Sequence, residues 1–206
     1  MPLLSKELKE NGFSKASTGG GAYLNPSQIN EGDKCRITFL GDDSITGYEV
    51  WVEGPEKNIS LRFKDEPTRS DIEERCSEVG GKFKKNLDTG EEEVQIKRFM
   101  AFAVWNYQTE TVQVFQFSQS SLATPIISYL SDEEIEAEPH LYDFVISKTK
   151  VGPLPRDVRY EVAALPGRRR KPDVNKQVET AWKKVTDESF NLQALISGGD
   201  PFNSPF

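Results

Sequence analysis

The segment from Lys97 to Tyr107 constrains the fold most, because read as a β-strand it is apolar on both faces. One face carries an ordinary core stripe, Met100, Phe102 and Val104. The other face carries rings at its ends and small residues between them: Phe99, Ala101, Ala103, Trp105 and Tyr107. Two interpretations follow. Either other elements cover the strand on both faces, or its second face is a surface on which nucleic-acid bases stack against the rings.

Other segments also read as strands. Residues 33–40 alternate, with Cys35, Ile37 and Phe39 on one face. The turn-rich stretch 41–47 is predicted to break the chain before the next strand. Further strands are predicted over residues 48–54, 58–64, 112–118, 140–150 and 158–165. Helices are predicted over residues 67–81, 118–132 and 174–185, the first with Ser70 as its N-cap and Glu73 completing a capping box.

This pattern predicts a mainly β fold: a five-stranded OB-fold-like Greek-key barrel with inserted and peripheral helices and a flexible C-terminal tail. A four-stranded sheet packed on helices is the alternative. We expect three parts: a flexible N-terminal arm (1–23), the barrel domain (24–186) and a disordered, partner-binding tail (187–206). No apolar run approaches the roughly 20 residues of a membrane helix. The N-terminus lacks the pattern of a signal peptide, so a cytoplasmic location is expected.

The charge of the chain is unevenly distributed. The net charge is −7, which at first argues against nucleic acid as a partner. Residues 131–140, however, hold five acids and no Lys or Arg, whereas residues 141–185 hold eleven bases against five acids. The densest basic run is Arg168 to Lys171, which either clamps phosphates or is a solvated turn. Segregated charge allows a local phosphate-binding surface on an acidic protein.

Motifs for catalysis and metal binding are absent from the sequence. Cys35, Cys76 and His140 are the only cysteines and histidine, too few for a four-ligand zinc site. The two cysteines are expected to be buried free thiols. No nucleophile elbow, zinc-protease motif or phosphate loop occurs. We therefore expect a protein that is not an enzyme and needs no metal or other cofactor.

Rings and cations recur side by side along the predicted strands. Single-stranded nucleic acid is held by such a combination, because cations pair with phosphates while rings stack on bases. The candidate DNA-binding residues are Trp51, Arg62, Phe63, Lys82, Lys84, Arg98, Phe99, Trp105, Tyr107, Lys148, Lys150, Arg159 and Tyr160. Among these, Trp51, Phe99, Trp105 and Tyr107 are the main stacking candidates.

The C-terminus repeats a Pro-Phe pair after Gly198-Gly199. A terminal Phe with its carboxylate suits capture in a pocket of another protein. The candidate partner-binding residues are Asp200, Pro201, Phe202, Pro205 and Phe206. A frayed terminus without a role is the alternative.

Three segments together resemble the single-stranded DNA-binding proteins of tailed bacteriophages. They are LNPSQINEGDKCRITFLGDDSITGYEVWV, KRFMAFAVWNYQTETVQVFQFSQSSL and HLYDFVISKTKVG, and the resemblance extends over roughly residues 24–165. The terminal SGGDPFNSPF is similar to the partner-recruiting tip of such proteins. Two departures stand out: this chain cannot build the zinc module of some larger relatives, and its tail holds few acids.

The resemblance implies an oligonucleotide-binding barrel that coats and protects single-stranded DNA in phage replication, recombination and repair. It also implies recruitment of a phage DNA polymerase, helicase or nuclease by the tail, in the cytoplasm of the infected bacterial host. The alternative function is a replication-associated protein-interaction module without DNA binding, whose rings are all core. The sequence leaves the oligomeric state open.

Overall fold

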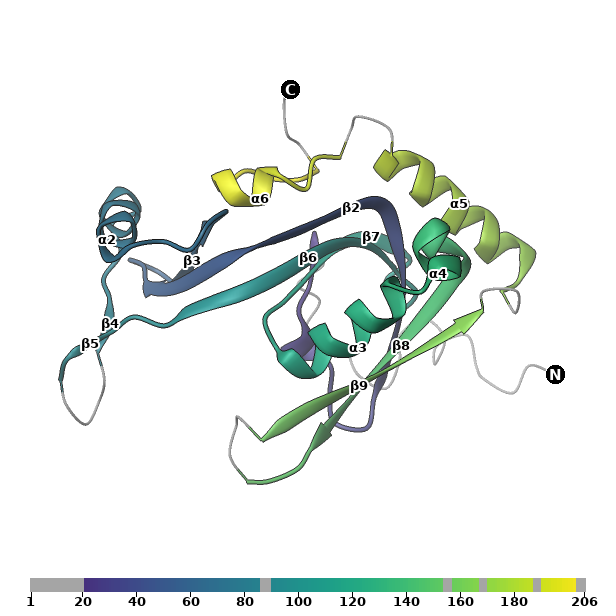
Figure 1. Ribbon diagram of the computed structural model, residues 1–206, viewed down its shortest axis with the longest axis horizontal. Helices are drawn as coiled ribbons and strands as arrows, with labels where there is room; N and C mark the ends of the chain where they lie inside the picture. The colour runs from purple at the N-terminus through teal and green to yellow at the C-terminus, as the bar shows by residue number, and fades with distance from the viewer. Residues whose placement is uncertain (1–20, 86–89, 154–156, 167–169, 187–189, 203–206) are drawn as a thin grey trace.

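A computed structural model describes residues 21–85, 90–153, 157–166, 170–186 and 190–202 (Figure 1). The fold is mainly β with helices around the strands, as the sequence predicted, but the strands form one large mixed sheet and not the predicted five-stranded barrel. Most of the predicted N-terminal arm lies outside the described residues.

The large sheet is organised around one long strand, β2, which pairs with β6, β8 and β3. The strand order is β1-β7-β6-β2-β8-β9, and β3 pairs with β2 off this path. The strands are β1 (Tyr23–Leu24), β2 (Lys34–Glu53), β3 (Asn58–Phe63), β6 (Ile96–Asn106), β7 (Thr111–Phe117), β8 (Tyr142–Lys150) and β9 (Val158–Pro166). A separate small hairpin joins β4 (Lys84–Lys85) to β5 (Glu92–Glu93).

The neighbouring strands β8-β2-β6-β7 have the order of a Greek key, in which the fourth strand returns beside the first. In the described part of the chain, β7 and β9 do not pair, so the sheet is not closed into a barrel. Other elements occupy the two edges. Strand β1 pairs in parallel with β7, and helix α3 (Ser120–Leu130) packs on β9, where the Tyr160 backbone N–H donates to Ser121 Oγ at 3.4 Å.

Strand β2 is continuous where the sequence predicted a turn. Its register against β6 shifts between Leu40 and Ser44, and Gly41 has φ +77°. A bulge of this kind inserts residues into one strand and changes which positions face which side. Leu40 and Ile45 consequently both lie on the same face. The stretch 41–47 is therefore a bulge within one strand and not a break between two.

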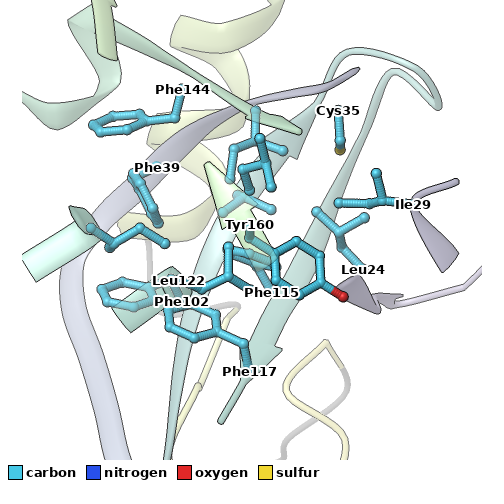
Figure 2. Packing of buried hydrophobic residues seen from close by; sticks show 14 of the residues in the cluster. Leu24, Ile29, Cys35, Phe39, Phe102, Phe115, Phe117, Leu122, Phe144 and Tyr160 are labelled. Atoms are coloured by element: carbon cyan, nitrogen blue, oxygen red, sulfur yellow. The ribbon is translucent and has the colours of Figure 1, made fainter. Parts of the chain in front are cut away.

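The main core lies on one face of the sheet, here called the inner face, which carries Phe39 and Phe102. Figure 2 shows the rings of Phe39, Phe102, Phe115, Phe144 and Tyr160 gathered there. Each of these residues belongs to a different strand of the sheet. Phe39 meets Phe102 edge-on at 5.0 Å and Phe144 at 4.6 Å between ring centroids. The predicted stripes of β2 and β6 are confirmed, since their members lie in this cluster.

The opposite, outer face of β6 is covered as well. Helix α5 (Pro172–Thr186) places Val178 and Ala181 over Leu40, Ala103 and Trp105. Figure 1 shows α5 and α6 (Ala194–Ser197) lying along the same side of β2. Both faces of this strand are therefore core, which was the first of the two interpretations of its sequence.

Residues 190–202, here called the C-terminal segment, complete the outer cover. Leu192 and Leu195 pack with Ile45, Phe99 and Ala101. The sequence predicted a disordered tail from residue 187; this part of it is folded onto the sheet because it supplies the apolar cover that β6 needs. Residues 187–189 and 203–206 lie outside the described structure.

A third cluster lies at the far end of β2, under helix α2 (Arg69–Glu78). Ile72 and Cys76 of this helix pack on Val50, Val52 and Leu61. The predicted cap was displaced by two residues: the N-cap is Thr68, and Asp71 completes the capping box. The Asp71 carboxylate accepts hydrogen bonds from the backbone N–H and the hydroxyl of Thr68. Thr68 and Asp71 therefore form the capping box that was predicted for Ser70 and Glu73. The remaining elements are the short helix α4 (Glu133–Ala137) and the 3-10 turns η1 (Pro26–Gln28) and η2 (Pro139–Leu141).

Replacing Leu195 by Ala tests whether the C-terminal segment belongs to the folded sheet. Leu195 is fully buried, so the loss of its packing should reduce the free energy of unfolding by about 2–5 kcal/mol. Denaturant titration followed by circular dichroism measures the change. Gln193→Ala, an exposed change in the same segment, is the control and should stay within about 0.5 kcal/mol of the wild type. Equal stability of L195A and the wild type would contradict the packed segment.

Candidate nucleic-acid interface

The structure separates the candidate DNA-binding residues into buried and exposed groups. Phe99 is 0% exposed, Tyr160 7% and Trp105 8%. Phe99 lies beneath the C-terminal segment and Trp105 beneath α5, while Tyr160 points into the main core with its hydroxyl donating to the Pro26 carbonyl at 3.1 Å. Bases cannot stack on rings covered in this way, so the stacking prediction does not fit these three positions.

Four candidates that are exposed or partly exposed lie on the arm, the part of the sheet formed by β3, residues 44–53 of β2 and residues 96–101 of β6. They are Trp51, Arg62, Phe63 and Arg98. In Figure 1 the arm extends away from α3 toward α2 and the β4–β5 hairpin. Trp51, at 44% exposure, lies on the outer face of the arm opposite Ser60. Helices α5 and α6 leave the ring of Trp51 accessible to solvent at this end of the sheet.

The outer face of the arm carries a row of alternating charge. Glu49 lies between Arg62 of β3 and Lys97 of β6, directly opposite both. It is only 5% exposed and accepts hydrogen bonds from Ser60 Oγ at 3.3 Å and Gln116 Nε2 at 2.9 Å. The carboxylate therefore offsets part of the positive charge that the two cations would present to a phosphate.

The inner face of the arm carries a different row. Tyr48 lies directly opposite Phe63 of β3 and Arg98 of β6. Residues directly opposite one another share a face, with Cβ atoms about 4.5–5.5 Å apart. Tyr48 and Phe63 are partly exposed, and Arg98 is exposed. Two aromatic residues and an arginine thus share one face of the sheet across three strands.

Lys82 and Lys84 belong to a mixed-charge surface beside α2. Lys82 pairs through its backbone with Glu53, and Lys84 lies opposite Glu93. A pocket here is lined by Glu53, Glu73, Cys76, Ser77, Gly81, Lys82, Phe83, Lys85 and Glu92. Because carboxylates and ammonium groups alternate around it, this surface favours no single sign of ligand charge.

The remaining cations lie at the other end of the sheet. Thr149 and Arg159 are directly opposite each other, and Lys150 pairs with Val158 nearby. Lys150 and Arg159 are exposed, whereas Lys148 Nζ donates to the Ser27 carbonyl at 2.9 Å. These cations are on a different part of the sheet from the arm, so the structure does not bring all the candidate residues into one groove.

Tyr107 is tied into a buried polar network centred on Asp143, which is 1% exposed. Tyr107 donates its hydroxyl to Asp143 Oδ1 at 2.5 Å, and Thr38 Oγ1 donates to the same atom at 2.8 Å. The Arg36 guanidinium lies 4.5 Å from the centre of the Tyr107 ring and also pairs with Asp143. The ring of Tyr107 is thus already stacked on a cation of its own chain.

Arg170 completes this network from the start of α5. Its guanidinium pairs with Asp143 at 2.8 Å, and the side chains of both residues are 1% exposed. Arg170 had been one of the basic-run residues predicted to clamp phosphates or sit in a solvated turn; it does neither. Arg168 and Arg169 lie outside the described residues, and Lys171 is exposed.

The network shifts the titration of its members. Burial of Asp143 opposes ionisation, but hydrogen bonds from Tyr107, Arg36 and Thr38 and the charge of Arg170 outweigh it, so its pKa lies below the ordinary value. Burial, together with the hydrogen bond to Asp143, raises the pKa of Tyr107 to about 12. Asp143 is consequently an ionised acceptor and Tyr107 a neutral donor at neutral pH.

The predicted partner-binding residues also fall into two groups, one within the folded C-terminal segment and one outside the described residues. Pro201 is buried, and Phe202 meets the ring of Phe190 edge-on at 5.2 Å. Asp200 Oδ1 accepts the Phe202 backbone N–H at 3.0 Å. The first Pro-Phe pair is therefore part of the folded C-terminal segment, while Pro205 and Phe206 lie outside the described residues.

Across the described ranges, no three His, Cys, Asp or Glu side chains gather in a way that could hold a metal ion. Cys35 and Cys76 are buried free thiols, as predicted. None of the helices described is long and apolar enough to cross a bilayer.

No protein-family model matches this sequence, and no curated protein matches it either. The geometry of the described residues is therefore the basis for a functional assignment.

Sequence reasoning missed Tyr48, Arg36 and Asp143. Tyr48 lies in a segment whose face depends on the bulge at Gly41, so its position beside Phe63 and Arg98 could not be read from alternation. Arg36 and Asp143 are 107 residues apart, and only the pairing of β2 with β8 brings them together.

Replacing Asp143 by Asn tests the network that fixes α5. The change leaves Arg170 buried without its counter-charge, and a broken buried pair costs about 3–5 kcal/mol. We expect the free energy of unfolding at pH 7 to fall by that amount in a urea titration. Glu161→Gln, an exposed charge change on β9, is the control and should have little effect. A D143N protein as stable as E161Q would contradict the network.

The same carboxylate predicts how stability depends on pH. Because the pKa of Asp143 is lower in the folded protein, its contribution is present above the unfolded pKa of about 3.9. It is lost as the pH falls through the lower folded value. The wild type should therefore lose more stability than D143N between about pH 5 and pH 2. Parallel curves for the two proteins would contradict the depressed pKa.

Proposed function

We propose that this protein is a non-catalytic, sequence-tolerant single-stranded DNA-binding protein of the tailed-bacteriophage type, with an OB-fold-like β domain. In this proposal it coats and protects single strands in phage replication, recombination and repair. The observation that carries it is the arm, where Trp51 is exposed and Tyr48 and Phe63 are partly exposed. Beside these rings, Lys97 and Arg98 are exposed and form no ion pair among the described residues. Rings that accept any base, beside cations for phosphates, suit binding without sequence preference.

The strand order supports the OB-fold part of the proposal. Strands β2, β6, β7, β8 and β9 are five in number, run in Greek-key order, and have a helix, α3, between the third and the fourth. An OB fold is a five-stranded, partly open Greek-key barrel. The open seam between β7 and β9 and the added strand β3 are where this chain departs from that description.

The proposed recruitment of a phage polymerase, helicase or nuclease is assigned to fewer residues than the sequence indicated. Pro201 and Phe202 pack within the C-terminal segment. In the proposal, Pro205 and Phe206 are then the pair that another protein captures in an apolar pocket.

The rival function, an interaction module without DNA binding, is favoured by one observation: Phe99 and Trp105 are buried. A titration with a fluorescein-labelled oligo-dT strand separates the two functions. We expect a rise in anisotropy on adding the protein, and an affinity that falls with salt at a slope of about −0.7 per phosphate contacted. The strand should remain intact when magnesium is present, as expected for a protein that is not a nuclease.

A duplex of the same length is the control, since its bases are not free to stack on the arm. Weaker binding to the duplex is expected. No salt-sensitive binding to oligo-dT at low ionic strength would contradict the proposed function and leave the interaction module as the better account.

A further inference from the structure

The outer face of the large sheet, where the sequence suggested base stacking, is not open to a ligand in this structure. The C-terminal segment covers it over Phe99 and Ala101, and α5 covers it over Trp105. Farther along the arm, the outer row holds the buried carboxylate of Glu49 between its two cations. A phosphate approaching that row would meet a negative charge as well as positive ones.

The inner face of the arm differs from the outer face, because the main core and the cluster under α2 both end near the row of Phe63, Tyr48 and Arg98. Toward the main core the next row is Thr46 and Met100, and toward α2 it is Val50, which is buried beneath that helix. In the row of Phe63, Tyr48 and Arg98, Phe63 packs against the edge of the α2 cluster, and Tyr48 and Arg98 lie between the two clusters. None of the three residues is buried. At this row of the inner face, part of the ring surface of Tyr48 and Phe63 is accessible to solvent.

The charge of this row is uncompensated. In the described part of the chain, Arg98 forms no ion pair, and the rows on either side consist of uncharged residues. Adjacent strands are about 4.8 Å apart, so the side chains of Arg98, Tyr48 and Phe63 leave the same face from three successive strands. A base on the rings would place its own phosphate within reach of a cation that no carboxylate competes for.

We infer that the inner-face row Phe63–Tyr48–Arg98 is a nucleotide-binding subsite, in which the rings stack on a base and Arg98 holds the backbone phosphate. The inference rests on the proposed function and deepens it, because it assigns binding to the inner face of the arm and not to the outer face. Tyr48 is the central residue, since it lies directly opposite both Phe63 and Arg98 in the strand register.

Conservative and disruptive changes at the same positions test the subsite. Tyr48→Leu removes the ring and keeps apolar bulk, and Tyr48→Phe keeps the ring. Stacking is worth about 1–3 kcal/mol per base, so Y48L should bind labelled oligo-dT about 5- to 150-fold more weakly, and Y48F within about 2-fold of the wild type. Arg98→Gln should lower affinity and reduce the salt slope by about 0.7, whereas Arg98→Lys should keep the slope.

Trp51 provides a comparison on the same strand but on the outer face. If the inference is right, Trp51→Leu weakens binding less than Y48L does. Normal binding by both Y48L and R98Q, with a large loss in W51L, would overturn the inner-face subsite while leaving the proposed function in place. Because Arg98 is exposed and makes no ion pair among the described residues, R98Q is informative even if Y48L is unstable. A wild type that does not bind oligo-dT would overturn both.

Discussion

The structure depends on the need to cover strand β6 on both of its faces. Its inner face is buried by the rings of the main core, and its outer face by α5 and the C-terminal segment. Burying apolar surface is the dominant favourable term in folding, so a strand of this composition recruits cover from any part of the chain. The Arg170–Asp143 ion pair then fixes where α5 lies, because a buried charge without its partner is strongly unfavourable.

This double cover determines where function can reside. A sheet whose middle is covered on both sides can offer a ligand only its uncovered ends, and under the proposed function the end that carries accessible rings is the arm. The helix α2 and its cluster stabilise the end of the arm, so the accessible rings stand between two packed regions. Under the proposed function, side chains held on paired strands would lose little conformational entropy when a ligand binds, which favours affinity from few contacts.

Alternation along the chain predicted the inner core stripes of β2 and β6, because period-two burial is a local property. It did not predict that Phe99 and Trp105 are buried. Their exposure depends on a C-terminal segment whose one helix, α6, has only four residues and whose Gly and Pro content resembles a disordered tail. The bulge at Gly41 likewise reverses the alternation within one strand. Tyr48 could therefore not be placed beside Phe63 and Arg98 until the register of β2 was known.

Counting cations along the sequence also overestimates the charge available to a ligand. Arg36 and Arg170 are committed to Asp143, Lys148 bonds to a backbone carbonyl, and Arg62 lies beside the buried Glu49. Arg98 is different because it is exposed and its neighbours on the inner face are uncharged. Under the proposed function, a protein of net charge −7 would then hold single strands mainly through stacking. Its affinity should consequently depend less on salt than that of a protein with many phosphate contacts, because each contact adds its own released counterion.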